Sequence, residues 1–142
     1  MALKYLLDTN TASFIIKGNP PAVRRRLAKL PASRIAISTI TEAELRYGVA
    51  RRPDAIKLNP IVEGFLARVE ILPWTSSAAM EYGALRADLE AAGLPMGNLD
   101  LLIAAHALAE GLILVSHDAA FRRIKRLKVE DWTAAPEKAE DA

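Results

Sequence analysis

Acidic residues follow the short apolar runs of this chain. Asp8 ends the first run and Asp118 closely follows the last, while Glu42, Glu44 and Asp100 come after the runs between them. If the runs are parallel strands, their carboxyl ends share one edge of a sheet, and ligands bind in the crevice at that edge. Carboxylate oxygens are hard ligands that suit Mg²⁺ or Mn²⁺, and the chain has no cysteine for a softer site. The pattern therefore indicates a metal-dependent phosphodiesterase.

Each acid also has a structural interpretation. Asp8 and Asp118 could cap the helices that follow them, and Asp100 would lie in a first helical turn, where the helix dipole favours an anion. The residues after Asp100, Leu101 to Ala105, are wholly apolar, so we expect that helix to be buried nearly all round. A buried carboxylate is costly unless it is paired or coordinates a metal, and converging carboxylates repel one another without a cation between them. Together, the acids favour a metal site.

Glu42 and Glu44 are alternative candidates for the glutamate of that metal site. Thr39-x-x-Glu42 and Thr41-x-x-Glu44 both match the capping box of a helix N-terminus. We expect Thr39 or Thr41 to cap the helix, with Glu42 as the better partner of Thr39. The two glutamates lie roughly 200° apart on the helix, so only one of them can face the acidic cluster directly.

Strand-like and helical patterns alternate along the chain. We expect strands at 3–7, 33–38, 69–72 and 112–115, with a fifth at 128–130. We expect helices at 9–17, 21–30, 39–50, 54–68, 76–92 and 97–110, and a short one at 119–125. Strands separated by helices imply a parallel sheet covered on both faces. The sequence thus predicts an α/β fold with four to five parallel strands.

Length and composition are those of one folded domain. The chain has 142 residues, of which 51% are hydrophobic and 25% charged. We place the domain at residues 1–133 and expect a polar, frayed tail at 134–142. The N-terminus shows no export signal, and no apolar stretch approaches the ~20 residues of a membrane span. These features predict a cytoplasmic protein, and the lack of cysteine fits a reducing compartment.

The net charge of +2 conceals an asymmetry. The first 129 residues hold 18 basic and 12 acidic residues, a formal charge of +6, whereas the remainder is mainly acidic. Bases cluster at 24–26, 51–52 and 122–128. If these clusters share a face they would attract phosphates, which favours a nucleic acid as partner, although each cluster could also be solvated helix surface.

Four segments around the acids carry motifs that are highly specific in combination. They read LDTN at 7–10, ISxITxAELxYG at 37–48, DxLIAxHA at 100–107 and LVSHDxxF at 114–121. With these motifs the chain resembles the PIN-domain ribonuclease toxins of the VapC type, from residue 3 to residue 132, where Val129-Glu130-Asp131-Trp132 matches the usual close. The resemblance implies a three-layer α/β/α fold around the parallel sheet.

Residue by residue, the resemblance implies an acidic pocket of Asp8, Glu44, Asp100 and Asp118 that binds Mg²⁺ or Mn²⁺. Asp8 and Asp100 would be the principal metal ligands, and Asp118 an outer ligand or the ligand of a second metal. Glu44 would orient the attacking water or bind the metal through it. In-line hydrolysis of RNA would leave a 5′-phosphate and would inhibit translation and growth.

Other polar residues lie beside these acids in the sequence. Thr9, Asn10 and Ser116 could hydrogen-bond a ligand or phosphate, or they could serve as turn residues. His117 stands where many members of the resembled family have Asn, so this position departs from the family pattern.

The resemblance also implies partners. Toxins of this type are usually held inactive by a small antitoxin whose C-terminal segment lies in a groove, and most of them form dimers. We therefore expect an antitoxin, an RNA substrate, a homodimer and a toxin–antitoxin hetero-oligomer. The helical segments 56–66 and 82–89 have Leu-rich faces that could serve these contacts, or could belong to the core.

Three other functions match parts of the pattern. His106 and His117 could act as the acid/base pair of a metal-independent ribonuclease. A non-catalytic, receiver-like phosphate-binding module would share the fold, but it would carry an acid after its third strand, where this chain has Leu72-Pro73-Trp74. A degenerate toxin would act only as a binding partner, but the presence of all four acids argues against it.

Overall fold

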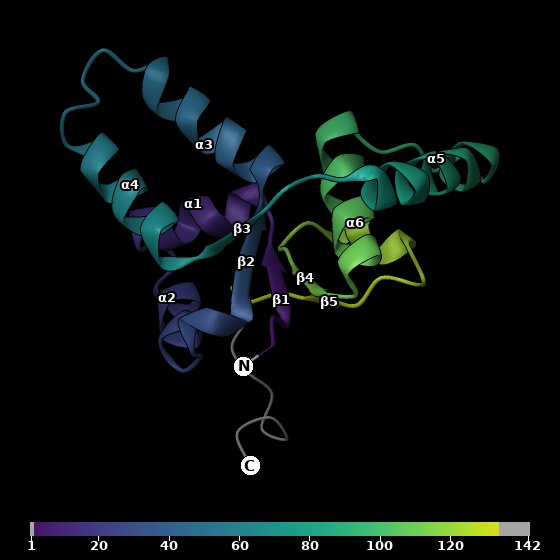
Figure 1. The fold of residues 1–142 in the computed structure, drawn as a ribbon, viewed down its shortest axis with the longest axis horizontal. Helices are drawn as coiled ribbons and strands as arrows, with labels where there is room; N and C mark the ends of the chain where they lie inside the picture. Colours follow the sequence, from purple (N-terminus) through teal and green to yellow (C-terminus); the bar gives the residue numbers. More distant parts are fainter. Residues whose placement is uncertain (1, 134–142) are drawn as a thin grey trace.

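The computed structural model describes residues 2–133, which form a three-layer α/β/α fold (Figure 1). A five-stranded parallel sheet is the middle layer, in the order β3-β2-β1-β4-β5. Its strands are β1 (Tyr5–Leu7), β2 (Ile35–Ser38), β3 (Glu70–Leu72), β4 (Ile113–Val115) and β5 (Val129–Glu130). The predicted parallel sheet is confirmed, including its short fifth strand.

Helices cover both faces of this sheet. They are α1 (Thr9–Lys17), α2 (Pro21–Ala28), α3 (Thr39–Ala50), α4 (Leu58–Arg68), α5 (Ser76–Ala91) and α6 (Asn98–Glu110), with short 3-10 helices η1 (Ala32–Arg34) and η2 (Ala119–Arg123). In Figure 1, α1 to α4 lie on one side of the sheet and α5 and α6 on the other. None of the helices within residues 2–133 is long and apolar enough to cross a membrane.

The three central strands, β1, β2 and β4, are almost wholly apolar because both of their faces are covered. Along β1, Tyr5 and Leu7 pack into one core with α1 and α4, whereas Leu6 packs into a second core with α5 and α6. Ile37 and Ala36 repeat this alternation on β2. Successive side chains of a strand point to opposite faces, so each apolar run supplies both cores.

The winding of the chain reverses next to β1. The first two crossovers place β2 and then β3 on one side of β1, and the next one returns to place β4 on its other side. In open α/β sheets such a reversal leaves a crevice at the carboxyl ends of the strands. Asp8 directly follows β1 and therefore lies at this point.

Most element boundaries lie within two residues of their predicted positions. The exception is α4, which the sequence predicts from residue 54 but which begins at Leu58, after turns over 53–57. Ile56 is 88% exposed, so a helix in this stretch would gain little from packing. The predicted short helix at 119–125 is the 3-10 helix η2. The predicted tail at 134–142 lies outside the described residues.

Candidate active site

Asp8 lies where β1 ends and α1 begins. Its Oδ1 accepts a hydrogen bond from the Thr11 N–H at 2.8 Å, which makes it the N-cap of α1. Its own N–H donates to the Val115 carbonyl at 3.1 Å and so ties the end of β1 to β4. The side chain is only 4% exposed, and this burial raises the pKa of the Asp8 carboxyl despite hydrogen bonds from Ser116 and Thr11. The predicted cap is confirmed, and it fixes this carboxylate at the edge of the sheet.

Asp100 lies in the first turn of α6, as predicted. The apolar segment after Asp100 predicts a helix that is buried nearly all round. Asp100 itself is only half-buried. Burial raises the pKa of its carboxyl, and the negative charges of Asp118, Asp8 and Glu44 raise it further. The fold therefore brings the other three predicted acids within electrostatic range of Asp100, although the four come from different elements.

Glu44 reaches the same region from α3. Its Oε1 accepts a hydrogen bond from the Thr9 hydroxyl at 2.9 Å, and the Thr9 oxygen lies 3.2 Å from the Thr41 hydroxyl oxygen. The single hydroxyl hydrogen of Thr9 goes to Glu44, so Thr41, which is fully buried, must donate its hydrogen to Thr9. This threonine relay, from Thr41 through Thr9, fixes the Glu44 carboxylate beside the start of α1.

Glu42 takes no part in the site, and the predicted capping boxes are wrong. Ser38, the last residue of β2, caps α3 by accepting the Ile40 N–H at 3.0 Å. The cap thus lies one residue before Thr39, so neither threonine predicted for that role performs it. Glu42 instead forms an ion pair with Arg46 at 3.0 Å, one turn further along α3.

Asp118 follows β4 and is the N-cap of η2. It accepts the Ala120 N–H at 2.9 Å, and its own N–H donates to the Ser116 hydroxyl at 3.0 Å. Ser116 is buried and also hydrogen-bonds Asp8, so this serine links the two aspartates. Asp118 is exposed, and its charge raises the pKa of both Asp8 and Asp100.

A pocket of about 390 Å³ lies at this edge of the sheet. Residues around the starts of α1 and α6 line it together with one glutamate of α3: Asp8, Thr9, Asn10, Glu44, Gly97, Asn98, Leu99 and Asp100. Asn98 lines the pocket although it is not among the predicted site residues, and its place two residues before Asp100 is the signal that indicates it. Asp118, Ser116 and His117 lie outside this lining.

The oxygen donors of this region fit a hard divalent cation that keeps several waters. Within residues 2–133, no three acidic or histidine side chains converge closely enough to hold a metal by themselves. Mg²⁺ is usually bound by one or two carboxylates together with waters and substrate phosphate, so a complete protein cage is not required. Burial and neighbouring acids raise the pKa of Asp8 and of Asp100, and a cation beside them would offset both effects.

The two histidines lie in different surroundings. His106 is fully buried in α6, its Nδ1 is 2.8 Å from the Ser38 Oγ, and burial lowers the pKa of its ring. His117 is exposed, and its Nδ1 lies 2.9 Å from the Asp131 carboxylate and 3.0 Å from the Thr133 hydroxyl. Each ring is bonded to residues outside the pocket, so the geometry does not favour an acid/base pair between them.

Known proteins share the overall sequence and the fold of this chain. The family model of the PIN domain matches residues 5–127. The tRNA(fMet)-specific endonuclease VapC of Salmonella typhimurium is 41% identical, over 92% of this chain and 98% of that protein. The chain belongs to the VapC-type PIN-domain family.

Other members of the VapC type share this PIN domain over nearly its whole length. Ribonuclease VapC2 of Rickettsia felis is 40% identical over 90% of this chain and 97% of that protein. The crystal structure of VapBC2 from Rickettsia felis, bound to a DNA fragment from their promoter, contains a chain that matches with a TM-score of 0.85 at 39% identity, over 92% of this chain and 99% of that chain. The resemblance to this family is confirmed, and it favours a nuclease over a receiver-like module.

Proposed function

We propose that this chain is the toxin of a toxin–antitoxin pair and acts as a metal-dependent endoribonuclease. The pocket carries this proposal, because three acids line one cavity at the reversal point of the sheet and a fourth acts on two of them electrostatically. Oxygen donors at the carboxyl edge suit Mg²⁺ or Mn²⁺ chemistry on a phosphodiester. The names of the relatives, endonuclease and ribonuclease, support the same activity.

Two carboxylates of the pocket are the proposed metal ligands. Asp8 and Asp100 line the same cavity from the start of α1 and the start of α6. When bound, Mg²⁺ or Mn²⁺ supplies a Lewis acid and lowers the pKa of a water molecule. Glu44 uses its Oε1 to accept the Thr9 hydroxyl, which leaves its Oε2 to orient the attacking water and accept a proton from it.

The remaining polar residues support this chemistry. We assign Asp118, whose backbone is bonded to Ser116, as an outer ligand or the ligand of a second metal. The amides of Asn10 and Asn98 line the pocket, where they can hydrogen-bond the phosphate oxygens of RNA. His117 is the exposed neighbour of Asp118 and can contact the same RNA strand.

RNA is the proposed substrate, and tRNA(fMet) is the first one to test. The Salmonella relative, which matches nearly the whole chain, is named as specific for tRNA(fMet). Five basic residues lie within ten positions of Asp118, and all of them are exposed: Arg122, Arg123, Lys125, Arg126 and Lys128. Among the described residues, Arg126 forms an ion pair with Glu81, and the other four form none. They are therefore available to phosphates.

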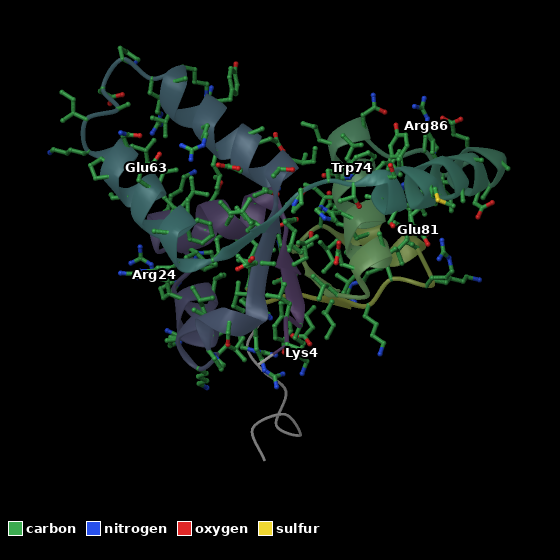
Figure 2. All side chains as sticks on the ribbon, in the orientation of Figure 1. Lys4, Arg24, Glu63, Trp74, Glu81 and Arg86 are labelled. Carbon is green, nitrogen blue, oxygen red and sulfur yellow. The ribbon has the colours of Figure 1, made fainter. Side chains whose placement is uncertain are left out.

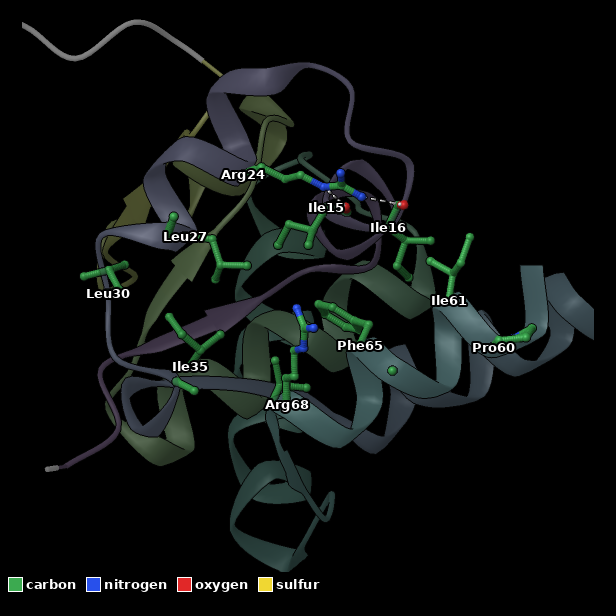
Figure 3. Close-up of a pocket in the computed structure, with 14 residues that line it drawn as sticks. Ile15, Ile16, Arg24, Leu27, Leu30, Ile35, Pro60, Ile61, Phe65 and Arg68 are labelled. Atoms are coloured by element: carbon green, nitrogen blue, oxygen red, sulfur yellow. Dashed lines mark hydrogen bonds between the residues drawn. The ribbon is translucent and has the colours of Figure 1, made fainter. Parts of the chain in front are cut away.

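An apolar groove is the proposed site of the antitoxin (Figure 3). It has a volume of about 720 Å³ and is lined by residues of α1, α2 and α4, with Ile15, Leu27 and Phe65 among them. Arg24 donates to carbonyls at the end of α1, whereas Arg68 has no ion-pair partner among residues 2–133. A segment with apolar side chains and one carboxylate opposite Arg68 would complement this groove.

The helical segments 56–66 and 82–89, which the sequence offers for partner contacts, differ in exposure. In the first, Ile61 is 50% exposed and lines the groove. In the second, Leu85 and Leu89 are buried in the core with α6, so core packing accounts for that face. A homodimer, a hetero-oligomer with the antitoxin and a cytoplasmic location remain parts of the proposed function.

Cleavage of RNA by the purified chain tests the nuclease. We expect 5′-labelled tRNA(fMet) to be cut in Mg²⁺ or Mn²⁺, to stay intact in EDTA, and to yield a product with a 5′-phosphate. Cleavage that survives EDTA would overturn the metal mechanism. No cleavage of tRNA(fMet), ribosomal RNA or messenger RNA would overturn the nuclease.

The groove is tested separately, with the small antitoxin that we propose a neighbouring reading frame encodes. We expect Ile61→Asp to weaken its binding, because the new charge would lie against apolar lining, and to leave RNA cleavage unchanged. Met80→Asp is the matched control, since Met80 is 78% exposed on α5, away from the groove. Equal loss of binding in both variants would contradict the assignment.

A further inference from the structure

His106 is a buried polar residue that the proposed function leaves unexplained. Its ring is fully buried, and its Nδ1 lies 2.8 Å from the Ser38 Oγ. Among residues 2–133, its Nε2 is the single buried side-chain nitrogen or oxygen without a hydrogen-bond partner. An apolar side chain would fill this space without an unpartnered nitrogen. The specific contribution of a histidine here is therefore its bond to Ser38.

Ser38 connects His106 to α3. It is fully buried at the end of β2, and it caps α3 by accepting the Ile40 N–H. Helix α3 carries Glu44, and α6 carries both His106 and Asp100. The bond between His106 and Ser38 therefore joins the two helices that bring Glu44 and Asp100 to the pocket.

A second link runs parallel to the first. Trp74 donates its backbone N–H to the Thr39 hydroxyl at 3.3 Å and its indole N–H to the Leu102 carbonyl at 2.9 Å. Thr39 is the first residue of α3, and Leu102 lies one turn before His106 in α6. Figure 2 shows Trp74 between the start of α3 and α6. Both links thus attach the start of α3 to the middle of α6.

We name Ser38, Thr39, Trp74 and His106 the α3–α6 clamp. We propose that His106 is a positioning residue that, through this clamp, fixes the Glu44 carboxylate relative to that of Asp100. The proposal rests on the ribonuclease function proposed above. His106 lies outside the lining of the pocket and acts on it through Ser38.

Displacement of one helix would affect the chemical step more than RNA binding. A shift of about 1 Å in the reacting groups can cost on the order of 10²-fold in rate. The exposed basic residues and the amides of the pocket, which we assign to RNA binding, do not belong to the clamp. Loss of the clamp should therefore lower kcat and leave KM almost unchanged.

Two substitutions of His106 separate positioning from packing. His106→Leu removes the bond to Ser38, whereas His106→Asn offers an amide N–H and a carbonyl oxygen and can preserve that bond in either direction. Ile103→Ala is the matched control, because Ile103 is equally buried in α6 but packs into the apolar core. It should destabilise the domain without loosening the clamp.

The experiment measures tRNA(fMet) cleavage, Mn²⁺ affinity by calorimetry with the metal alone, and unfolding. For His106→Leu we expect kcat and Mn²⁺ affinity to fall roughly 10- to 100-fold, the loss typical of residues that orient metal ligands. His106→Asn should recover most of both, and Ile103→Ala should retain both below its melting temperature. In unfolding, His106→Leu combined with Ser38→Ala should be less destabilising than the sum of the two single variants.

The clamp would be refuted if His106→Leu had the same kcat and Mn²⁺ affinity as Ile103→Ala, or if His106→Asn were as impaired as His106→Leu. It would also be refuted if the losses of unfolding free energy in His106→Leu and Ser38→Ala simply added in the double variant. If wild-type protein cleaves no RNA, the proposed ribonuclease function fails. The unfolding cycle and the Mn²⁺ affinity would still decide whether His106 positions the acids.

Discussion

The threonine relay allows the role of Glu44 to be tested without altering any acid. Thr9→Val removes one hydroxyl and nearly preserves the shape of the side chain. It deletes the bond to Glu44 at 2.9 Å and leaves the buried Thr41 hydroxyl without its acceptor. An unsatisfied buried polar group costs about 1–3 kcal/mol. For a chain of this length each kcal/mol lowers the melting temperature by about 2–4 °C, so we expect a loss of about 2–12 °C.

Activity should fall for a different reason. Without the Thr9 hydroxyl, the Glu44 carboxylate can rotate away from the attacking water, and we expect roughly 10- to 100-fold slower cleavage. The assays are thermal melting in EDTA and cleavage of tRNA(fMet) in Mg²⁺. Thr9→Ser keeps the hydroxyl and is the control, which should stay close to wild type in both.

A double variant separates the two effects. Thr9→Val with Thr41→Val replaces the half-buried hydroxyl and the buried one by apolar groups of similar shape, a change that is nearly neutral for stability. We expect its melting temperature to recover and its activity to remain low, because Glu44 still lacks a donor. Full activity in either Thr9→Val variant would refute the proposed orientation of Glu44 by Thr9.

Three further predictions concern the acids themselves. Asp8→Asn should abolish cleavage at nearly unchanged stability, because Asn caps helices as well as Asp does; loss of circular dichroism or retained activity would contradict this. Asp100→Asn should stabilise the metal-free protein or leave it unchanged, because the raised pKa of Asp100 means that ionisation of this group disfavours folding. In melts across pH, the gain in melting temperature over wild type should grow above the ordinary pKa of 3.8 and vanish below it. Glu44→Gln should slow catalysis strongly. Glu42→Gln should stay active and melt almost as wild type, because Glu42 contributes only an exposed ion pair with Arg46. An inactive Glu42→Gln would mean that the face of α3 with Glu42, rather than the face with Glu44, serves the pocket.

The strands and the acids could be predicted because each depends on local sequence. A strand buried on both faces reads as a continuous apolar run, as β1, β2 and β4 do, and all five predicted strands are present. The family motif alone selects Glu44 over Glu42, and the capping boxes predicted for α3 do not form. Ser38, Thr39 and Thr41 are all good caps, and the last residue of β2 takes that role because it lies where the strand ends.

The links that orient the site depend on contacts far apart in sequence. Thr9 and Glu44 are 35 residues apart, and His106 and Ser38 are 68 residues apart. Composition and periodicity contain no signal for such pairs, because helix packing against the sheet sets which side chains meet. The start of α4 differs from the prediction for a related reason, because residues 53–57 are mostly exposed and packing would add little to a helix there.

Anomalous diffraction from crystals of this protein soaked in Mn²⁺ tests the central claim most directly. The proposed ligand set predicts a peak between the carboxylates of Asp8 and Asp100, and it predicts that this peak disappears in Asp8→Asn crystals soaked in the same way. A peak that persists in the variant, or Mn²⁺ bound only at other positions, would contradict the assignment of this pocket as the metal site.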